Sequence, residues 1–137
     1  LLRSANPHIL TLCPPPSLES KWWAPHTGYT LAKMGMSFVT LGLAAEFGDR
    51  GIAINALWPR TLIATDALNM IPGVSAANGR TPEIMADAAH AVLTREARGF
   101  AGNFLIDDEV LGEAGITDFS RYAVDASQPL YPDLFLD

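Results

Sequence analysis

The chain is poor in cysteine and in basic residues, and both shortages limit what it can do. Its single cysteine, Cys13, cannot form an internal disulfide framework, which fits a reducing compartment and predicts a cytoplasmic protein. Its 9 Lys and Arg against 15 Asp and Glu give a net charge of −6, so we expect no nucleic-acid partner. No apolar run is long enough to cross a bilayer, and residues 1–7 lack the apolar core of a signal peptide. We therefore expect no membrane insertion.

The chain does have enough apolar sequence to build a core. Hydrophobic residues make up 49% of its 137 positions, which predicts one globular domain at most. Short apolar runs predict strands at residues 9–12, 52–58 and 104–106. Helical patterns cover residues 27–47, a segment beginning at Thr81-Pro82-Glu83, and residues 107–113. This alternation predicts an α/β fold with a parallel sheet of about three strands and crossover helices.

Three segments are expected to be irregular. Three consecutive prolines after the first strand predict a loop over residues 14–25. Residues 61–80 show no clean period and follow the second strand, a place where mobile substrate lids occur. Residues 128–137 form a tail interrupted by prolines.

The predicted helix over residues 27–47 is the longest element of the chain. Its apolar residues keep helical spacing at Leu31, Met34, Phe38, Leu41 and Ala45. Glycine is costly inside a helix, so Gly35 and Gly42 suggest the close approach of another helix or strand.

The start of this helix carries the most informative pair of residues, Tyr29 and Lys33. Positions i and i+4 lie on one face of a helix, about one turn apart. An ammonium beside a phenol favours the phenolate and lowers a pKa that otherwise lies near about 10. Such a tyrosine can exchange a proton with a reacting oxygen near neutral pH. The alternative is a helix whose Tyr29 packs inward while Lys33 extends to water.

Candidate functional residues cluster where the predicted strands end. Residues 13–17 follow the first strand, Tyr29 and Lys33 lie beside it, and residues 59–65 follow the second. Ligands of open parallel sheets bind beyond the carboxyl ends of the strands, so these groups converge on the expected site.

Other conspicuous residues allow more than one interpretation. Trp22 and Trp23 either line an apolar substrate cavity or cover core, and an apolar pocket is also suggested by Leu62, Met70 and Ile71. The three histidines lack metal-ligand spacing. The acidic run at residues 107–109 begins a helix, where the helix dipole favours acids. We expect no metal site.

Two motifs resemble a known family. The run Tyr-x-x-x-Lys at the start of a long helix resembles the signature of the short-chain dehydrogenase/reductases. Residues 55–65, Asn-Ala-Leu-Trp-Pro-Arg-Thr-Leu-Ile-Ala-Thr, look like the family's Asn-Ala-x-x-Pro-Gly-x-Ile-x-Thr. Residues 24–37, 102–107 and 134–137 further resemble a hydroxysteroid dehydrogenase-like group of that family. The resemblance implies the C-terminal half of a Rossmann-like doubly wound parallel sheet, with residues 1–137 as a partial domain.

The resemblance also implies roles for individual residues. Tyr29 would be the proton donor and, with Lys33, part of the cofactor-binding site; Lys33 would lower the pKa of Tyr29 and hold the cofactor ribose. The nicotinamide would be bound by Pro59, Ile63 and Thr65. An alternative role for Thr65 is that of a plain helix N-cap.

The chain departs from the family pattern in two places. Arg60 stands where the family has glycine, and one residue is inserted before Ile63. The family's substrate-binding serine has no direct counterpart, because counting back from Tyr29 or aligning the strand reaches proline. Ser17 is the nearest hydroxyl and is our candidate for polarising the substrate carbonyl, the alternative being a solvated loop serine.

The glycine-rich turn that binds a dinucleotide pyrophosphate is absent, since no Gly-x-Gly occurs in the chain. We therefore expect the amino-terminal cofactor-binding half to be missing, and the choice between NAD and NADP is not readable. The predicted function is an NAD(P)-dependent oxidoreductase that interconverts an alcohol and a carbonyl on an apolar, lipid-like substrate. We expect a homo-oligomer formed through the helix of Tyr29 and Lys33. The alternatives are a truncated, non-catalytic dimerising remnant and a generic α/β domain.

Overall fold

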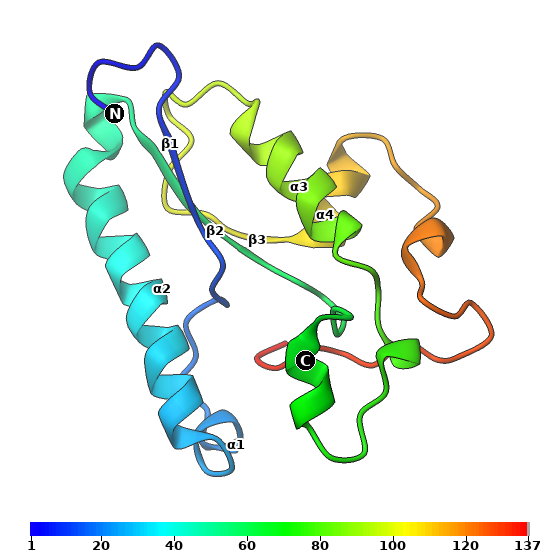
Figure 1. Ribbon diagram of the computed structural model, residues 1–137. Helices are drawn as coiled ribbons and strands as arrows, with labels where there is room; N and C mark the ends of the chain where they lie inside the picture. The colour runs from blue at the N-terminus through cyan, green and yellow to red at the C-terminus, as the bar shows by residue number, and fades with distance from the viewer. Residues whose placement is uncertain (137) are drawn as a thin grey trace. The chain divides into compact units, whose positions relative to one another are not determined.

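The computed structural model describes residues 1–136, without the side chain of Asn69. The chain divides into two compact units, which are described separately (Figure 1). The first unit comprises Leu1–Trp58 and Leu93–Leu105, and the second comprises Pro59–Val92 and Ile106–Asp137. Asp137, the last residue of the predicted tail, lies outside the described residues.

The sheet contains the three predicted strands in the order β1 (His8–Thr11), β2 (Ala53–Trp58) and β3 (Phe104–Ile106). β1 and β2 run parallel, with His8 opposite Ala53 and Thr11 opposite Ala56. Every residue of β2 is buried, as its continuous apolar sequence predicts for a central strand, whereas β1 is half-buried at the sheet edge. The prediction of an α/β fold with a parallel sheet is confirmed.

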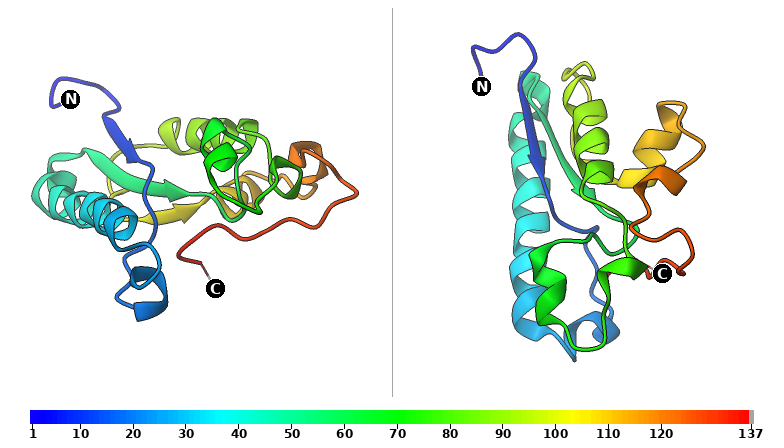
Figure 2. Two further views of the ribbon diagram at one scale, coloured as in Figure 1. Left: turned by 60° about the horizontal axis from the view of Figure 1, so that its bottom comes forward. Right: turned by 45° about the vertical axis from the view of Figure 1, so that its right-hand side comes forward.

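Helix α2 (Thr27–Phe47) has the predicted bounds and packs beside β1 and β2 (Figure 2). Its buried face differs from the apolar spacing seen in the sequence, because only Met34 of that series is buried. Leu31 is 63% exposed and Phe38 is 50% exposed. The residues that face inward are instead Thr30, Met34, Ser37 and Thr40.

The inward-facing hydroxyls of α2 satisfy carbonyl groups of the proline-rich segment that follows β1. The Ser37 hydroxyl donates to the Pro14 carbonyl at 2.7 Å, and the Thr30 hydroxyl donates to the Trp22 carbonyl at 2.7 Å. Because an irregular segment offers its carbonyls no ladder partner, side-chain donors are favoured over apolar groups at this contact.

The predicted loop over residues 14–25 contains a single helical turn, α1 (Ser20–Trp23), which the sequence interpretation missed. The indole N–H of Trp23 donates to the Ser17 carbonyl at 3.2 Å and closes the segment on itself. One turn is too short to give a periodic pattern, so only tertiary contacts define it.

The second unit contains α3 (Glu83–Leu93), α4 (Asp107–Glu113) and the 3₁₀ turns η2 (Asp66–Met70), η3 (Ala76–Asn78) and η4 (Ser120–Tyr122). A fourth 3₁₀ turn, η1 (Gly48–Arg50), follows α2 in the first unit. Helices α3 and α4 agree with prediction. The Thr81 hydroxyl hydrogen-bonds the Glu83 carboxylate at the start of α3 and lowers the pKa of that carboxyl. The buried face of α3 is formed by Ile84, Ala88 and Val92.

No helix among residues 1–136 is long and apolar enough to span a membrane.

Asn55, fully buried in β2, joins this strand to the segment that leads into β3. Its amide NH₂ donates to the Phe100 carbonyl at 2.8 Å. Its carbonyl oxygen accepts from the backbone N–H of Asn103 at 3.0 Å and from the Asn103 side chain at 2.8 Å. The side chain thus takes over pairing that the backbone does not complete at this point of the sheet.

Replacing Asn55 by Ala should destabilise the protein by about 1–3 kcal/mol, because half-buried groups of both Phe100 and Asn103 lose their partner. Urea unfolding measures this change in the free energy of unfolding. The exposed Gln128→Ala variant is the control and should unfold like the unmodified protein. An Asn55→Ala variant of unchanged stability would show that these side-chain hydrogen bonds contribute nothing to the free energy of unfolding.

Candidate active site

Tyr29 and Lys33 lie on one side of α2, as their spacing predicts. The Lys33 Nζ is 6.0 Å from the centroid of the Tyr29 ring. Tyr29 is 46% exposed, so its side chain is not a core residue. The alternative in which Tyr29 packs inward therefore does not describe this structure.

Two further residues of the first unit hold the Lys33 ammonium. Its Nζ donates to the Leu12 carbonyl at 3.1 Å and lies 5.1 Å from the centroid of the Trp58 ring. Leu12 follows the last residue of β1, and Trp58 is the last residue of β2. The ammonium consequently lies at the carboxyl ends of two parallel strands, where such sheets bind ligands.

Trp58 is a site residue that sequence reasoning did not single out. It is only 4% exposed, and its ring contacts the lysine by a cation–π interaction. Its place at the end of a continuous apolar strand was the available signal, but that pattern equally describes a core tryptophan.

Ser17 belongs to the same unit and contacts α2 through its backbone, whose N–H lies 3.4 Å from the Met34 sulfur. Its hydroxyl oxygen accepts a hydrogen bond from the Glu19 N–H at 3.3 Å. An oxygen in this turn keeps its own O–H for donation. The residue is half-buried, and its assignment as the substrate-binding serine stays a prediction.

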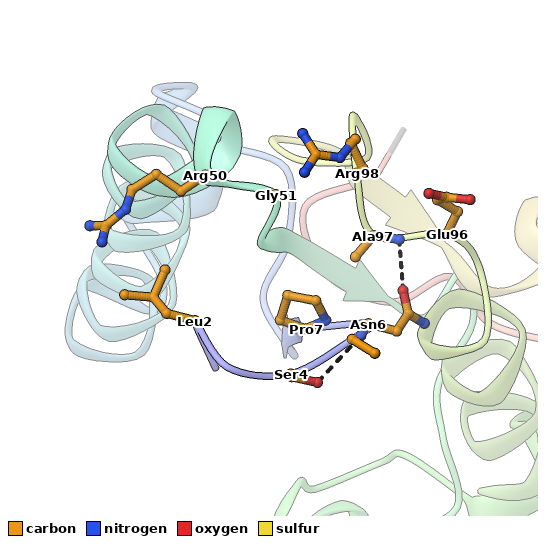
Figure 3. Close-up of a pocket in the computed structure, with 10 residues that line it drawn as sticks. Leu2, Ser4, Asn6, Pro7, Arg50, Gly51, Glu96, Ala97 and Arg98 are labelled. Atoms are coloured by element: carbon orange, nitrogen blue, oxygen red, sulfur yellow. Dashed lines mark hydrogen bonds between the residues drawn. The ribbon is translucent and has the colours of Figure 1, made fainter.

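The hollow described in the first unit lies at the other end of its strands. It measures about 220 Å³ and is lined by residues that precede β1 and β2, among them Pro7 and Gly51 (Figure 3). Arg50, Glu96 and Arg98 also border it. Because this is the amino end of the sheet, the hollow is separate from the Tyr29 and Lys33 site.

The predicted cofactor residues Pro59, Ile63 and Thr65 belong to the second unit. Thr65 precedes η2, but its side chain makes no capping hydrogen bond, so the alternative role as a plain N-cap is not realised. The Ile63 carbonyl accepts from the Thr65 N–H at 2.8 Å. Among the described residues, no acceptor takes up the Ile63 amide N–H. The segment therefore offers a backbone donor and a hydroxyl to a ligand.

Arg60, the departure from the family pattern, pairs with the acidic start of α4. Its Nε donates to both carboxylate oxygens of Asp108, at 2.7 and 2.9 Å, and its guanidinium also pairs with Glu109. These hydrogen bonds, that of Asp108 first, raise the pKa of Arg60. The acidic run therefore pairs with the Arg60 guanidinium as well as starting a helix. The sequence did not indicate this pairing, because the residues are far apart along the chain.

Asp107 is fully buried beside this pair. Its Oδ1 accepts from the backbone N–H of Arg60 at 2.9 Å and of Asp108 at 2.8 Å. Burial raises the pKa of Asp107, and the two backbone hydrogen bonds oppose that rise.

The predicted apolar lining residues are distributed over both units. Trp22 and Trp23 are half-buried in the first unit, where Lys21 stacks on Trp22 at 4.8 Å. In the second unit Met70 is 79% exposed and Ile71 is 47% exposed. Half-burial of the tryptophans is compatible with both pocket lining and core cover.

Comparison with known proteins agrees with this geometry. No protein-family model matches the chain. Over its whole length the chain is 51% identical to hydroxysteroid dehydrogenase-like protein 2 of Danio rerio and 45% identical to that of Homo sapiens. Its fold matches a crystal structure of a Xanthomonas campestris protein assigned as a dehydrogenase, with a TM-score of 0.97, 76% identity and coverage of 99% of this chain. A short-chain dehydrogenase of Mycobacterium thermoresistibile matches with a TM-score of 0.86, 47% identity and 98% coverage.

Along its whole length the chain is similar to hydroxysteroid dehydrogenase-like proteins and to a short-chain dehydrogenase. The resemblance to the hydroxysteroid dehydrogenase-like group and the Rossmann-like fold class are both confirmed. The chain spans 33% of the Danio rerio relative and 32% of the human one. It spans 50% and 48% of the two solved dehydrogenases.

Replacing Trp58 by Leu should release the Lys33 ammonium, because it removes a cation–π contact that contributes about 0.5–1 kcal/mol at a solvent-accessible site. We expect the Tyr29 phenol to titrate at higher pH in this variant. Tyrosinate absorbance, measured as the difference from the same protein carrying Tyr29→Phe, reports that titration.

The matched control is Trp22→Leu, which removes a tryptophan whose ring contacts Lys21 instead of Lys33. Its Tyr29 titration should be unchanged. If Trp58→Leu also left the titration where it was, the indole would not position the ammonium.

Proposed function

We propose that the protein carrying this chain is an NAD(P)-dependent oxidoreductase that interconverts an alcohol and a carbonyl, using Tyr29 and Lys33 as its acid/base pair. The observation that carries the proposal is the exposed phenol beside an ammonium that is itself held at the carboxyl ends of β1 and β2. Dehydrogenase relatives over the whole chain support the same reaction class.

In this reaction Tyr29 moves the proton. During reduction its O–H donates to the carbonyl oxygen as hydride reaches the carbonyl carbon, and during oxidation the phenolate takes the alcohol proton. The nicotinamide supplies or accepts the hydride. Lys33 keeps the phenol acidic by its positive charge, and its remaining N–H groups can bind a ribose hydroxyl.

The second unit supplies the proposed contacts to the nicotinamide. The Ile63 N–H and the Thr65 hydroxyl are a donor pair suited to a carboxamide, and the hydrogen bond from the Thr65 N–H to the Ile63 carbonyl closes a turn between them. Pro59 is buried and begins this segment. These observations support a nicotinamide cofactor, with NAD and NADP equally allowed.

For the substrate we propose an apolar, lipid-like alcohol or carbonyl compound. Ser17 would donate its hydroxyl to the reacting oxygen, which polarises a carbonyl. Within the first unit, apolar lining would come from the half-buried Trp22 and Trp23. The Pro-rich segment that carries Ser17 is pinned to α2 by the Ser37 hydroxyl, which favours a fixed position for the serine.

Tyr29→Phe should lower kcat by about 10²- to 10⁴-fold, the usual contribution of general acid–base catalysis, and leave cofactor affinity nearly unchanged. Turnover is followed by nicotinamide absorbance with a panel of apolar alcohols and aldehydes. Tyr131→Phe is the matched control, because Tyr131 is 45% exposed and Tyr29 is 46% exposed. Equal turnover in both variants would exclude Tyr29 as the acid.

We also propose that the protein is a homo-oligomer that pairs through α2. The outward face of this helix is apolar at Leu31, Phe38 and Val39. A Cβ added at Gly28, Gly35 or Gly42 would meet nothing within 4 Å, so the seven-residue glycine spacing leaves room for a neighbour. The same face would serve the alternative function, a non-catalytic dimerising remnant. Saturable binding of NADH or NADPH separates the two, because only the enzyme requires it.

Gly35→Leu should weaken this association at least about tenfold, since a branched side chain blocks the close approach of a second helix. Sedimentation velocity over a range of concentrations measures the dissociation. Gly112→Leu in α4 is the matched control, because a Cβ at Gly112 also meets nothing within 4 Å. Association that is unaffected by Gly35→Leu would exclude α2 as the contact.

A further inference from the structure

Arg60 is attached to the start of α4 by both its backbone and its side chain. Its N–H donates to Asp107, its Nε donates to both oxygens of Asp108, and its guanidinium pairs with Glu109. Two guanidinium nitrogens, Nε on Asp108 and Nη2 on Glu109, fix the direction of the arginine as well as its distance. Residue 60 is therefore among the most restrained positions of the second unit.

Asp108 binds a second arginine and so links two segments of the chain. Arg80 is 8% exposed, and its Nη1 donates to the Asp108 carboxylate at 3.3 Å. The backbone of Arg80 flanks Ile63 in a parallel bridge. Its N–H donates to the Leu62 carbonyl at 2.8 Å, and its carbonyl accepts from the Ala64 N–H at 2.9 Å. One carboxylate thus restrains the segment before Ile63 and the segment beside it.

The backbone next to Ile63 is also closely packed. A Cβ added at Gly79 would lie 2.7 Å from the Leu62 carbonyl oxygen, which no real side chain tolerates. On its other side the segment pairs with the tail, where the Leu62 N–H donates to the Tyr131 carbonyl at 3.0 Å. We therefore expect a small movement of Arg60 to shift the backbone of Ile63 and Thr65, because the closely packed neighbours leave no free space to accommodate it.

The buried carboxyl group of Asp107 also holds the backbone at residue 60. One of its oxygens accepts from two backbone N–H groups, and the other has no partner among the described residues. This fully buried side chain holds the residue 60 backbone through the hydrogen bond from the Arg60 N–H. Charged groups that surround it in the second unit are Arg60, Arg80, Asp108 and Glu109.

We propose that Arg60 is a positioning residue for cofactor binding: locked by Asp108 and Glu109, it fixes the segment whose Ile63 N–H and Thr65 hydroxyl meet the nicotinamide. This inference rests on the proposed function. It gives the unexpected arginine a role, because the charge that replaces a small residue is matched by the acidic start of α4. Arg60 itself does not touch the reacting atoms and acts through the backbone that follows it.

The test compares Arg60→Gln with the unmodified full-length protein. NADH and NADPH titrations followed by nucleotide fluorescence give Kd, and turnover assays give kcat and both KM values. We expect the Kd and the KM for the cofactor to rise about tenfold while the KM for the carbonyl substrate stays within about twofold, because a charge-assisted hydrogen-bond pair is lost. Arg60→Lys, which keeps the charge but not the two guanidinium nitrogens, should recover only part of the affinity.

Asp108→Asn provides a second route if Arg60→Gln folds poorly, since it preserves shape. Combined with Arg60→Gln it should weaken cofactor binding no further than either change alone, because both break one contact. Arg121→Gln is the matched control: Arg121 pairs with Asp87 at 2.9 Å in the same unit, without contacting residues 60–65. A purely structural role would lower the thermal unfolding midpoint in both arginine variants and leave Kd unchanged.

If the unmodified protein binds cofactor and Arg60→Gln binds it equally well, the positioning role is overturned while the proposed function stands. If Tyr29→Phe is inactive in the same assays, that reaction assignment is supported independently of Arg60. If the unmodified protein shows no saturable cofactor binding, both proposals are overturned. An increase in Kd confined to Arg60 and Asp108 variants supports the inference.

Discussion

The parallel pairing of β1 with β2 is the constraint on which the chemistry of the first unit depends. Because both strands end at the same edge, the Leu12 carbonyl and the Trp58 ring reach one point, and the Lys33 ammonium occupies it. The buried Asn55 holds the third strand's approach to β2. Hydroxyls of α2 then fix the helix against the proline-rich segment. Helical spacing puts Tyr29 beside the lysine, and these contacts place the pair at the strand ends.

Polar groups do much of the work that apolar packing does in other helices and loops. The inward face of α2 carries three hydroxyl residues and one methionine, and its outward face carries leucine, phenylalanine and valine. Such an inversion leaves apolar area without a partner in the described residues, as expected of a surface that meets another chain. In the second unit, two arginines and three acids restrain one short segment. Both units therefore rely on specific, directional contacts.

Much of this architecture could be predicted from local sequence. The bounds of α2 and α4, the buried strand β2 and the start of α3 follow from apolar runs, glycine exits and a proline in a first turn. The buried side of α2 could not be predicted. Apolar spacing locates an apolar face of the helix, but it does not say whether that face packs on the sheet or lies on the surface. The single turn α1 was missed because one turn has no period. The family resemblance followed from the two motifs and agrees with relatives at 45–51% identity.

The sequence by itself determined the α/β fold class, the family resemblance and the placement of Tyr29 and Lys33 on one helical face, because these follow from motifs and spacing along the chain. Tertiary structure alone decided that the Trp58 ring contacts Lys33 and that Arg60 pairs with Asp108 across 48 residues of sequence. It also decided that the Thr65 hydroxyl makes no capping hydrogen bond to η2. Local pattern fixes the direction of a side chain relative to its own element. Which group it meets there depends on how strands pair and where loops return, and that is settled only by the fold.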